Sequence, residues 1–242
     1  MTIKNWHQYV ALYLNRVKNE LVVLEMRKGV KIMLRVNSTD LMAFTHVWLL
    51  HEYDKPGFEI KNDDVVIDIG AHIGLFALFS AQFCKNGKIY CFEPIKENFD
   101  LLKANLDLNN IKNVVAVNAA VSASTGIVTI YLNEDEAGHS MYVTGSKQIQ
   151  VKSISLQDIF DSNILERCNF LKIDCEGEEY EIIKSLSTPY FDKISKMCIE
   201  YHFADTKPHL LQDIIKKLKS SAYTITTRKI LPSIGFLYAK KN

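Results

Sequence analysis

The sequence has 242 residues, with 29 basic and 28 acidic side chains and a formal net charge of +1. A chain of this length forms one large domain or two small ones, and 48% hydrophobic with 24% charged residues is ordinary for a protein that buries a core. These figures exclude an intrinsically disordered chain. The near-neutral charge also argues against nucleic acid as a partner.

The chain contains five cysteines and no C-x-x-C pair, which favours neither a disulfide framework nor a thiolate zinc site. No apolar run approaches the roughly 20 residues that cross a bilayer. The N-terminus lacks the continuous apolar stretch of a secretory signal. We therefore expect a cytoplasmic protein with reduced thiols and no transmembrane segment, and whether it forms a homo-oligomer stays open.

The first 60 residues differ in pattern from the rest of the chain. Apolar spacing and turn residues predict a helix, two strands that form a hairpin, and a second helix, over residues 6–14, 21–26, 30–36 and 41–50. Pro56-Gly57 then breaks the chain.

From residue 65 onward, predicted strands and helices alternate. Short apolar runs predict strands that are buried on both faces, and apolar positions at helical spacing predict the helices between them. The expected strands cover residues 65–69, 88–92, 113–117, 170–174, 196–201, 222–227 and 234–239, with a further hairpin over 127–132 and 149–153. This order predicts an α/β fold, a doubly wound, mostly parallel seven-stranded Rossmann-like sheet with an antiparallel last strand.

The strand over 65–69 runs into a glycine-rich turn, Asp68-Ile-Gly70-Ala71-His72-Ile-Gly74. Such a turn lets the backbone approach a ligand, and ligands of open α/β sheets bind outside the carboxyl ends of the strands. Glu93, nineteen residues past Gly74, can accept hydrogen bonds from both hydroxyls of a ribose. His72 fills the position of the middle glycine that clears room for a pyrophosphate, so the turn suits a nucleoside without phosphates, such as S-adenosylmethionine. The alternative is an ordinary tight turn. We expect a side chain at Gly70 to block the ligand while leaving the protein folded.

Acidic residues follow two later strands. Asp174 and Glu176 come between a strand and a helix on the rim where the glycine turn lies, whereas Glu178 is explained by the helix dipole. Glu200 and His202 end the next strand on one side of it, because side chains alternate along a strand. His202 is the candidate general base, and the alternative is a hydrogen-bonded structural histidine.

These motifs resemble the FkbM-type S-adenosylmethionine-dependent methyltransferases over residues 64–202. Five separated motifs carry the resemblance: 66–74, 92–94 with Asn98 and Asn105, 118–121 with Gly126, 156–158 with 172–179, and 200–202. Cys175 and Glu178 stand where the family more often has small or aliphatic residues.

The resemblance implies the class I methyltransferase fold and S-adenosylmethionine as the cofactor. It assigns the cofactor site to Asp68, Gly70, Ala71, His72, Gly74, Glu93, Pro94, Asn98, Asn118 and Ala119. We divide the chain into an N-terminal extension over 1–60, which serves as an acceptor-site lid or an interface, and a methyltransferase domain over 61–242. The walls of the acceptor pocket are expected from this extension and from the loop over 134–145, which offers His139 and Tyr142.

The predicted function is therefore methyl transfer to an oxygen, which the resemblance places on a hydroxyl of a sugar, glycan or secondary metabolite. The predicted catalytic residues are His202, Asp174 and Glu200. His202 removes the proton of the acceptor hydroxyl, and Asp174 and Glu200 orient the ring of His202. Alternatively, Asp174, Glu176 and Glu200 hold a divalent cation such as Mg²⁺, which lowers the pKa of the acceptor hydroxyl.

Three other functions remain as alternatives. A nicotinamide-dependent reductase on a similar sheet is disfavoured by the missing middle glycine. A non-catalytic methyltransferase-fold module, binding a partner through the N-terminal segment, is disfavoured by the presence of Asp68, Glu93 and Asp174. An RNA methyltransferase is disfavoured by the neutral charge.

Overall fold

The structure is a computed structural model that describes residues 2–132 and 147–241. The elements of its N-terminal part are α1 (Trp6–Tyr13), β1 (Leu21–Glu25), β2 (Lys31–Arg35), α2 (Asp40–Phe44) and the π-helical turn η1 (Thr45–Leu49). The elements that follow are β3 (Val65–Ile69), α3 (Leu75–Ser80), β4 (Lys88–Phe92), α4 (Lys96–Leu108), β5 (Val114–Val117), β6 (Ala120–Ser122), β7 (Gly126–Leu132), β8 (Lys147–Ser155), α5 (Leu156–Ser162), β9 (Phe170–Ile173), α6 (Glu179–Ser185), α7 (Thr188–Asp192), β10 (Lys196–Tyr201), α8 (Pro208–Ser220), β11 (Tyr223–Lys229) and β12 (Gly235–Lys241).

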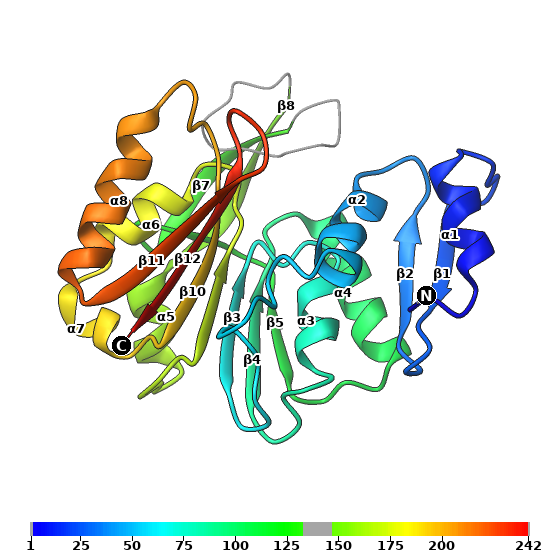
Figure 1. The fold of residues 1–242 in the computed structure, drawn as a ribbon, viewed down its shortest axis with the longest axis horizontal. Helices are drawn as coiled ribbons and strands as arrows, with labels where there is room; N and C mark the ends of the chain where they lie inside the picture. The colour runs from blue at the N-terminus through cyan, green and yellow to red at the C-terminus, as the bar shows by residue number, and fades with distance from the viewer. Residues whose placement is uncertain (1, 133–146, 242) are drawn as a thin grey trace.

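Seven strands form one twisted sheet in the order β11-β12-β10-β9-β3-β4-β5 (Figure 1). The pairs β5–β4, β4–β3, β3–β9 and β9–β10 are parallel, whereas β12 runs antiparallel to both of its neighbours, β10 and β11. The predicted α/β fold is thus confirmed, including the antiparallel last strand.

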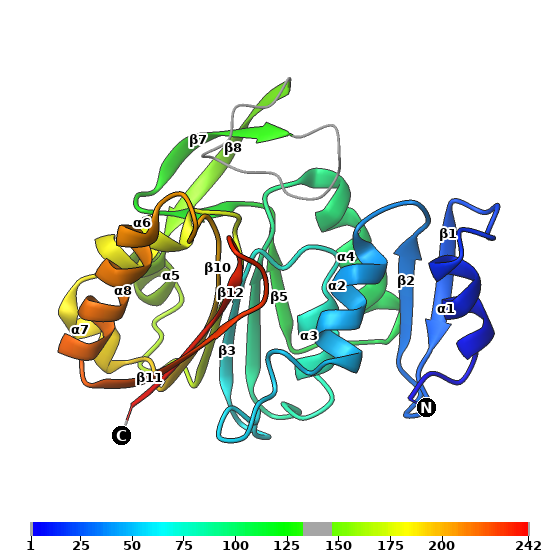
Figure 2. The same ribbon diagram turned by 45° about the horizontal axis from the view of Figure 1, so that its top comes forward.

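A second, three-stranded sheet has the order β6-β8-β7. Its antiparallel pair β7–β8 is the hairpin predicted over 127–132 and 149–153, and Figure 2 shows this pair at the top of the view, away from the seven-stranded sheet. The sequence analysis did not predict β6, α5 or α7, which are short elements of three to seven residues.

The helix predicted over 41–50 is divided in two, because α2 is followed directly by the π-helical turn η1. The hydroxyl of Thr45 donates to the carbonyl of Leu41 at 2.8 Å, and such a bond from a side chain to the preceding turn competes with regular helix pairing. The amide of Leu50 then donates to the carbonyl of Thr45 at 2.9 Å, five residues back. In the described part of the chain, no helix is both long and apolar enough to cross a membrane.

Side chains of the sheet alternate between two hydrophobic cores. Val66 belongs to the core that contains α3, α4 and the N-terminal elements, whereas Ile67 and Ile69 belong to the core under α5, α6 and α8. The first core also includes Leu24, Leu34 and Trp48. The N-terminal segment and the sheet therefore share one continuous core, and Figure 1 shows β1 and β2 beyond α4.

Asn105 of α4 and Asn109, the C-cap residue of that helix, dock the N-terminal hairpin through hydrogen bonds like those of a neighbouring strand. The side-chain oxygen of Asn105 accepts from the amide of Met33 at 2.7 Å, and its nitrogen donates to the carbonyls of Met33 and Ile73 at 3.1 and 3.0 Å. Asn109 bonds to the amide and carbonyl of Lys31 in the same way, at 2.8 and 2.6 Å. A carboxamide carries the same donor and acceptor as a peptide group, so these residues pair with the outer edge of β2.

We expect Asn105→Ala to destabilise the protein by about 2–4 kcal/mol, because it leaves several backbone groups without partners in a buried place. Asn109→Ala is the matched control, since its bonds to Lys31 are exposed and water can replace them. Urea unfolding of the two variants measures the difference. Equal losses in both would contradict the assignment of Asn105 as the main anchor of the hairpin.

Candidate active site

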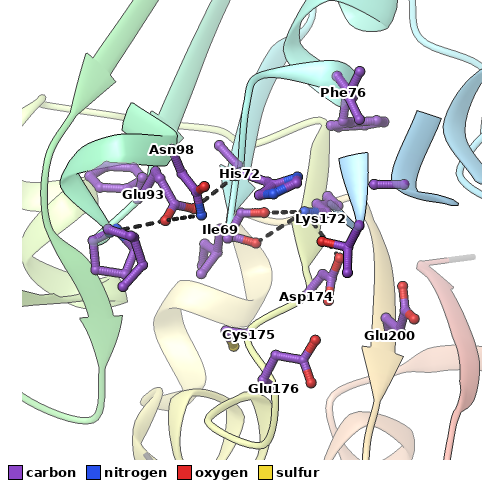
Figure 3. Close-up of a pocket in the computed structure, with 18 of the residues that line it drawn as sticks. Ile69, His72, Phe76, Glu93, Asn98, Lys172, Asp174, Cys175, Glu176 and Glu200 are labelled. Atoms are coloured by element: carbon purple, nitrogen blue, oxygen red, sulfur yellow. Dashed lines mark hydrogen bonds and ion pairs between the residues drawn. The ribbon is translucent and has the colours of Figure 1, made fainter. Parts of the chain in front are cut away.

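A cavity of about 530 Å³ lies at the carboxyl ends of β3, β4, β9 and β10, a volume typical of small-molecule sites (Figure 3). The N-terminal segment forms part of its wall through Arg35, Thr39, Met42, His46 and Tyr53, as the sequence analysis expected. Ile130 of β7 and Lys147 of β8 also line it. The predicted contribution of residues 134–145, with His139 and Tyr142, lies outside the described residues.

The glycine turn is packed against the chain that leaves β9. The amides of Gly70 and Ala71 both donate to the carbonyl of Phe92 at 3.0 Å, which ties the turn to β4. Gly70 has φ +72°, and a Cβ at this position would lie 1.7 Å from the carbonyl oxygen of Asp174. The expectation that a side chain at Gly70 leaves the protein folded is therefore wrong, because the clash is with backbone.

Glu93 closes the turn from the side of β4. Its carboxylate accepts from the amide of His72 at 2.8 Å and from the amide of Ile95 at 3.0 Å. The side-chain amide of Asn98 lies 3.4 Å away. Burial raises the pKa of Glu93 to about 7. Glu93 lines the cavity, and its Oε2, which accepts the bond from His72, has a further lone pair for a ligand hydroxyl, whereas Oε1 accepts from both Ile95 and Asn98.

The side chain of His72 extends from the turn into a polar cluster at the wall of the cavity. Its Nε2 lies 3.2 Å from a guanidinium nitrogen of Arg35 and 3.3 Å from a carboxylate oxygen of Asp40. Burial lowers the pKa of His72 to about 4, so the ring is neutral. Arg35 and the fully buried Asp40 form a bidentate pair beside it, at 2.7 and 3.0 Å.

Lys172 is a buried cation in the middle of the sheet. Its ammonium lies 3.1 Å from Asp68 and 3.6 Å from Asp174, and it donates to the carbonyl of Gly70 at 2.6 Å. Burial alone lowers the pKa of Lys172, but the carboxylates of Asp68 and Asp174 raise it above its ordinary value. Figure 3 shows the ammonium between Ile69 and Asp174. The sequence analysis assigned no role to Lys172, although a lysine inside the buried strand Phe170–Ile173 requires a partner.

Tyr53, Asp174 and Glu200 meet at the other side of the cavity. The hydroxyl of Tyr53 lies 2.9 Å from an oxygen of Glu200 and 3.2 Å from an oxygen of Asp174. Burial raises the pKa of Glu200 to about 8, and the neighbouring charge of Asp174 acts in the same direction. All three residues line the cavity. The sequence analysis missed Tyr53, since nothing in its surroundings in the sequence marks a functional tyrosine.

His202 lies behind this cluster and not among the residues that line the cavity. Its Nδ1 is 3.2 Å from Glu179 and its Nε2 is 3.4 Å from Glu176. Burial alone lowers the pKa of His202, but the hydrogen bond and charge of Glu179 raise it to about 10. The ring is therefore an imidazolium at neutral pH, which argues against His202 as a general base.

A divalent cation does not fit this arrangement. Among the described residues, Asp174, Glu200 and His202 offer ligand atoms within 4.8 Å of one another, a set that differs from the predicted one by replacing Glu176 with His202. Both ring nitrogens of His202 already face carboxylates, those of Glu179 and Glu176, and the ammonium of Lys172 faces Asp174. The charge that a cation would supply is thus partly supplied by Lys172.

The structure brings most of the predicted site residues to one cavity. Those that line it are Gly70, Ala71, His72, Glu93, Pro94, Asn98, Asp174, Glu176 and Glu200. Those that do not are Asp68, Gly74, Asn118, Ala119 and His202. Asp68 instead faces Lys172, and the side chain of Asn118 donates to the carbonyls of Glu93 and Pro94 at 2.9 and 3.0 Å. Both therefore support the residues at the cavity from behind.

The sheet order, the antiparallel last strand and the cavity bounded by a glycine turn and Glu93 define a class I methyltransferase architecture. The family model for the methyltransferase FkbM domain matches residues 68–225, and the chain belongs to this family of methyltransferases. Membership supports neither a nicotinamide-dependent reductase nor a non-catalytic module.

Two relatives and one solved structure illustrate the similarity. The hexuronic acid methyltransferase AglP of Haloferax volcanii is 25% identical over 183 residues, which cover 76% of this chain and 73% of that protein. The 31-O-demethyl-FK506 methyltransferase FkbM of Streptomyces tacrolimicus is 23% identical over 210 residues, which cover 73% and 79%. The crystal structure of methyltransferase FkbM from Methylobacillus flagellatus has a TM-score of 0.56 at 16% identity and covers 81% of this chain. This chain spans about half of that one, 47% of its length.

We expect Lys172→Met to cost about 3–5 kcal/mol of folding free energy, because it leaves the carboxylate of Asp68 buried without its cation. The double variant Asp68→Asn with Lys172→Met removes both charges and should lose less than Lys172→Met alone. Urea unfolding gives the free energy of unfolding of the two single variants and of the double variant, which together form a double-mutant cycle. Additive losses would show that the two side chains do not stabilise each other.

Proposed function

We propose that the protein transfers a methyl group from S-adenosylmethionine to a hydroxyl of a sugar, glycan or secondary metabolite. The observation that carries the proposal is one cavity with two chemically different sides. Glu93 and the glycine turn suit a nucleoside at one side, and Glu200 suits an acceptor proton at the other. The names of two relatives, one acting on a hexuronic acid and one on 31-O-demethyl-FK506, support an oxygen acceptor of this kind.

Glu93 would hold a ribose hydroxyl of the cofactor, because its carboxylate lines the cavity and keeps a lone pair beyond its bonds to the turn. Gly70, Ala71 and His72 border the same space, as do Pro94 and Asn98. Asp68 and Gly74 act on the cofactor site through the turn, and Asn118, which precedes Ala119, acts through the backbone of Glu93 and Pro94. When bound, S-adenosylmethionine supplies a methyl group whose bond to sulfur breaks, with the electron pair staying on sulfur, as the bond to the acceptor oxygen forms.

Glu200 is the proposed proton acceptor in place of His202. A general base works best when its pKa lies near the working pH, and the pKa of Glu200 is raised to about 8. The proton of the acceptor hydroxyl passes to a carboxylate oxygen of Glu200 as the new carbon–oxygen bond forms. Asp174 lies beside this site, paired with Lys172, and His202 pairs with Glu176 and Glu179.

We expect Glu93→Gln to weaken binding of S-adenosylhomocysteine about 10- to 100-fold, since hydrogen bonds to a charged acceptor contribute about 1.5–3 kcal/mol. Calorimetry measures the affinity, and circular dichroism checks the fold. Glu178→Gln is the control, because Glu178 is also buried and hydrogen-bonded, to Ser122, but does not line the cavity. An unchanged affinity in Glu93→Gln would remove this residue from the cofactor site.

The second expected outcome concerns pH. Glu200 must be unprotonated to accept a proton, so kcat/KM should rise as the pH approaches 8 and level off above it. Glu200→Gln should lower turnover about 10²- to 10⁴-fold and remove this limb. Transfer of a labelled methyl group from S-adenosylmethionine to a panel of hexoses and hexuronic acids provides the assay.

His202→Asn tests the alternative base in the same assay. If His202→Asn loses the rise of kcat/KM with pH while Glu200→Gln keeps it, the base is His202 and the proposed role of Glu200 is wrong. If both variants keep the limb, the group that titrates lies on the acceptor.

A further inference from the structure

We propose that Tyr53 of the N-terminal segment is a positioning residue that orients the carboxyl group of Glu200 for proton transfer. The inference deepens the proposed function and rests on it for the role of Glu200. Tyr53 precedes the region matched by the family model, which begins at residue 68. The general base would thus be oriented by a residue outside the matched domain.

The phenol ring of Tyr53 is held firmly in place. Its side chain is 4% exposed, and its ring centroid lies 5.3 Å from that of Phe76 and 5.4 Å from that of Phe236. The ammonium of Lys172 lies 5.7 Å from the centre of the ring. The ring therefore delivers its hydroxyl to one fixed point at the edge of the cavity.

At that point the hydroxyl of Tyr53, which has a single hydrogen to donate, lies near two carboxylate groups. It lies closer to Oε2 of Glu200, at 2.9 Å, than to Oδ2 of Asp174, at 3.2 Å. A phenol donates one hydrogen bond, so it can serve only one of them at a time. Donation to Oε2 of Glu200 leaves Oε1 as the oxygen that can take the acceptor proton.

A carboxylate needs such a partner because the last torsion of a glutamate is broad and does not itself fix the two oxygens. In the described structure, the hydroxyl of Tyr53 donates a hydrogen bond to the carboxyl group of Glu200. Once Glu200 has taken a proton, the hydroxyl of Tyr53 can turn to Asp174 without movement of its ring, since both oxygens are within reach. The same phenol can thus stabilise the site before and after proton transfer.

The backbone that precedes Tyr53 is anchored to β11 and β12. The preceding residue, Glu52, is 2% exposed, and its carboxylate forms an ion pair with Arg228 of β11. The carbonyl of Glu52 accepts from the hydroxyl of Tyr238 of β12 at 2.9 Å. The position of Tyr53 is therefore set by β11 and β12 as well as by its own ring contacts.

The test compares Tyr53→Phe with Tyr223→Phe. Both changes remove one hydroxyl from a tyrosine that is 4% exposed and donates a hydrogen bond, at 2.9 Å to Glu200 for Tyr53 and at 2.7 Å to the carbonyl of Ile194 for Tyr223. Of the two, only Tyr53 lines the cavity. Tyr53→Phe should lower kcat about 10- to 100-fold, with KM and the affinity for S-adenosylhomocysteine unchanged. Tyr223→Phe should leave all three unchanged, and urea unfolding verifies that both variants are folded.

The pH dependence of kcat/KM distinguishes loss of the hydrogen bond from loss of packing, because loss of packing alone would not shift the pH profile. The groups that act on Glu200 are Tyr53, Asp174, Lys172 and His202, and the hydrogen bond from Tyr53 favours its ionised form. In Tyr53→Phe, the rising limb of kcat/KM should therefore move to higher pH. In Tyr223→Phe it should stay where it is in the wild-type protein.

Infrared spectroscopy of the protein without cofactor or acceptor tests the contact by itself. The carbonyl-stretch band of the protonated Glu200 carboxyl group should disappear in Glu200→Gln, and in Tyr53→Phe it should shift and titrate at higher pH. If the wild-type protein transfers methyl groups and Tyr53→Phe matches it in rate, limb and band, the inference is overturned and the proposed function stands. If the wild-type protein binds no S-adenosylmethionine, the proposed function fails, and an unchanged band in Tyr53→Phe would overturn the contact as well.

Discussion

The buried ammonium of Lys172 is the interaction on which the rest of the site depends. Asp68 and Lys172 are directly opposite each other in the parallel pair β3–β9, so the sheet register itself brings their charges together. Because Lys172 also reaches the carbonyl of Gly70 and the carboxylate of Asp174, it joins the glycine turn to the end of β9. The glycine turn and Asp174, which border the cavity on two sides, are thus held at a fixed spacing by one side chain.

Burial, together with charge pairing behind the cavity, sets the pKa values of the carboxyl groups within it. Lys172 faces Asp68 and Asp174, and His202 faces Glu179 and Glu176. Glu93 and Glu200 have no salt bridge among the described residues, and burial raises their pKa values to about 7 and about 8. Burial also raises the pKa of Glu176 to about 7, although His202 lowers it. All three carboxyl groups line the cavity and can therefore exchange a proton or accept hydrogen bonds near neutral pH.

The sequence was sufficient for the sheet and for the glycine turn, because the buried strands are continuous apolar runs and the turn lies directly after one of them. It was insufficient for the contacts that give the site its chemistry. Tyr53 meets residues 121 and 147 positions further along the chain, and no local pattern encodes such a contact. The environment of His202 was missed for the same reason, since its partner Glu179 lies 23 positions earlier in the chain.

The two sides of the cavity are built from different parts of the chain, and this has a consequence for the proposed specificity. The side proposed for the cofactor consists of Glu93 and the turn at residues 70–72, which are fixed by hydrogen bonds between neighbouring strands. The side proposed for the acceptor combines Glu200 with Tyr53 and with the wall from residues 35–47. The N-terminal segment contacts the turn through Arg35 and Asp40, which lie 3.2 and 3.3 Å from Nε2 of His72. We therefore expect acceptor choice to vary through other cavity-lining residues of this segment, such as Met42 and His46, with the contacts of Arg35 and Asp40 to the turn kept.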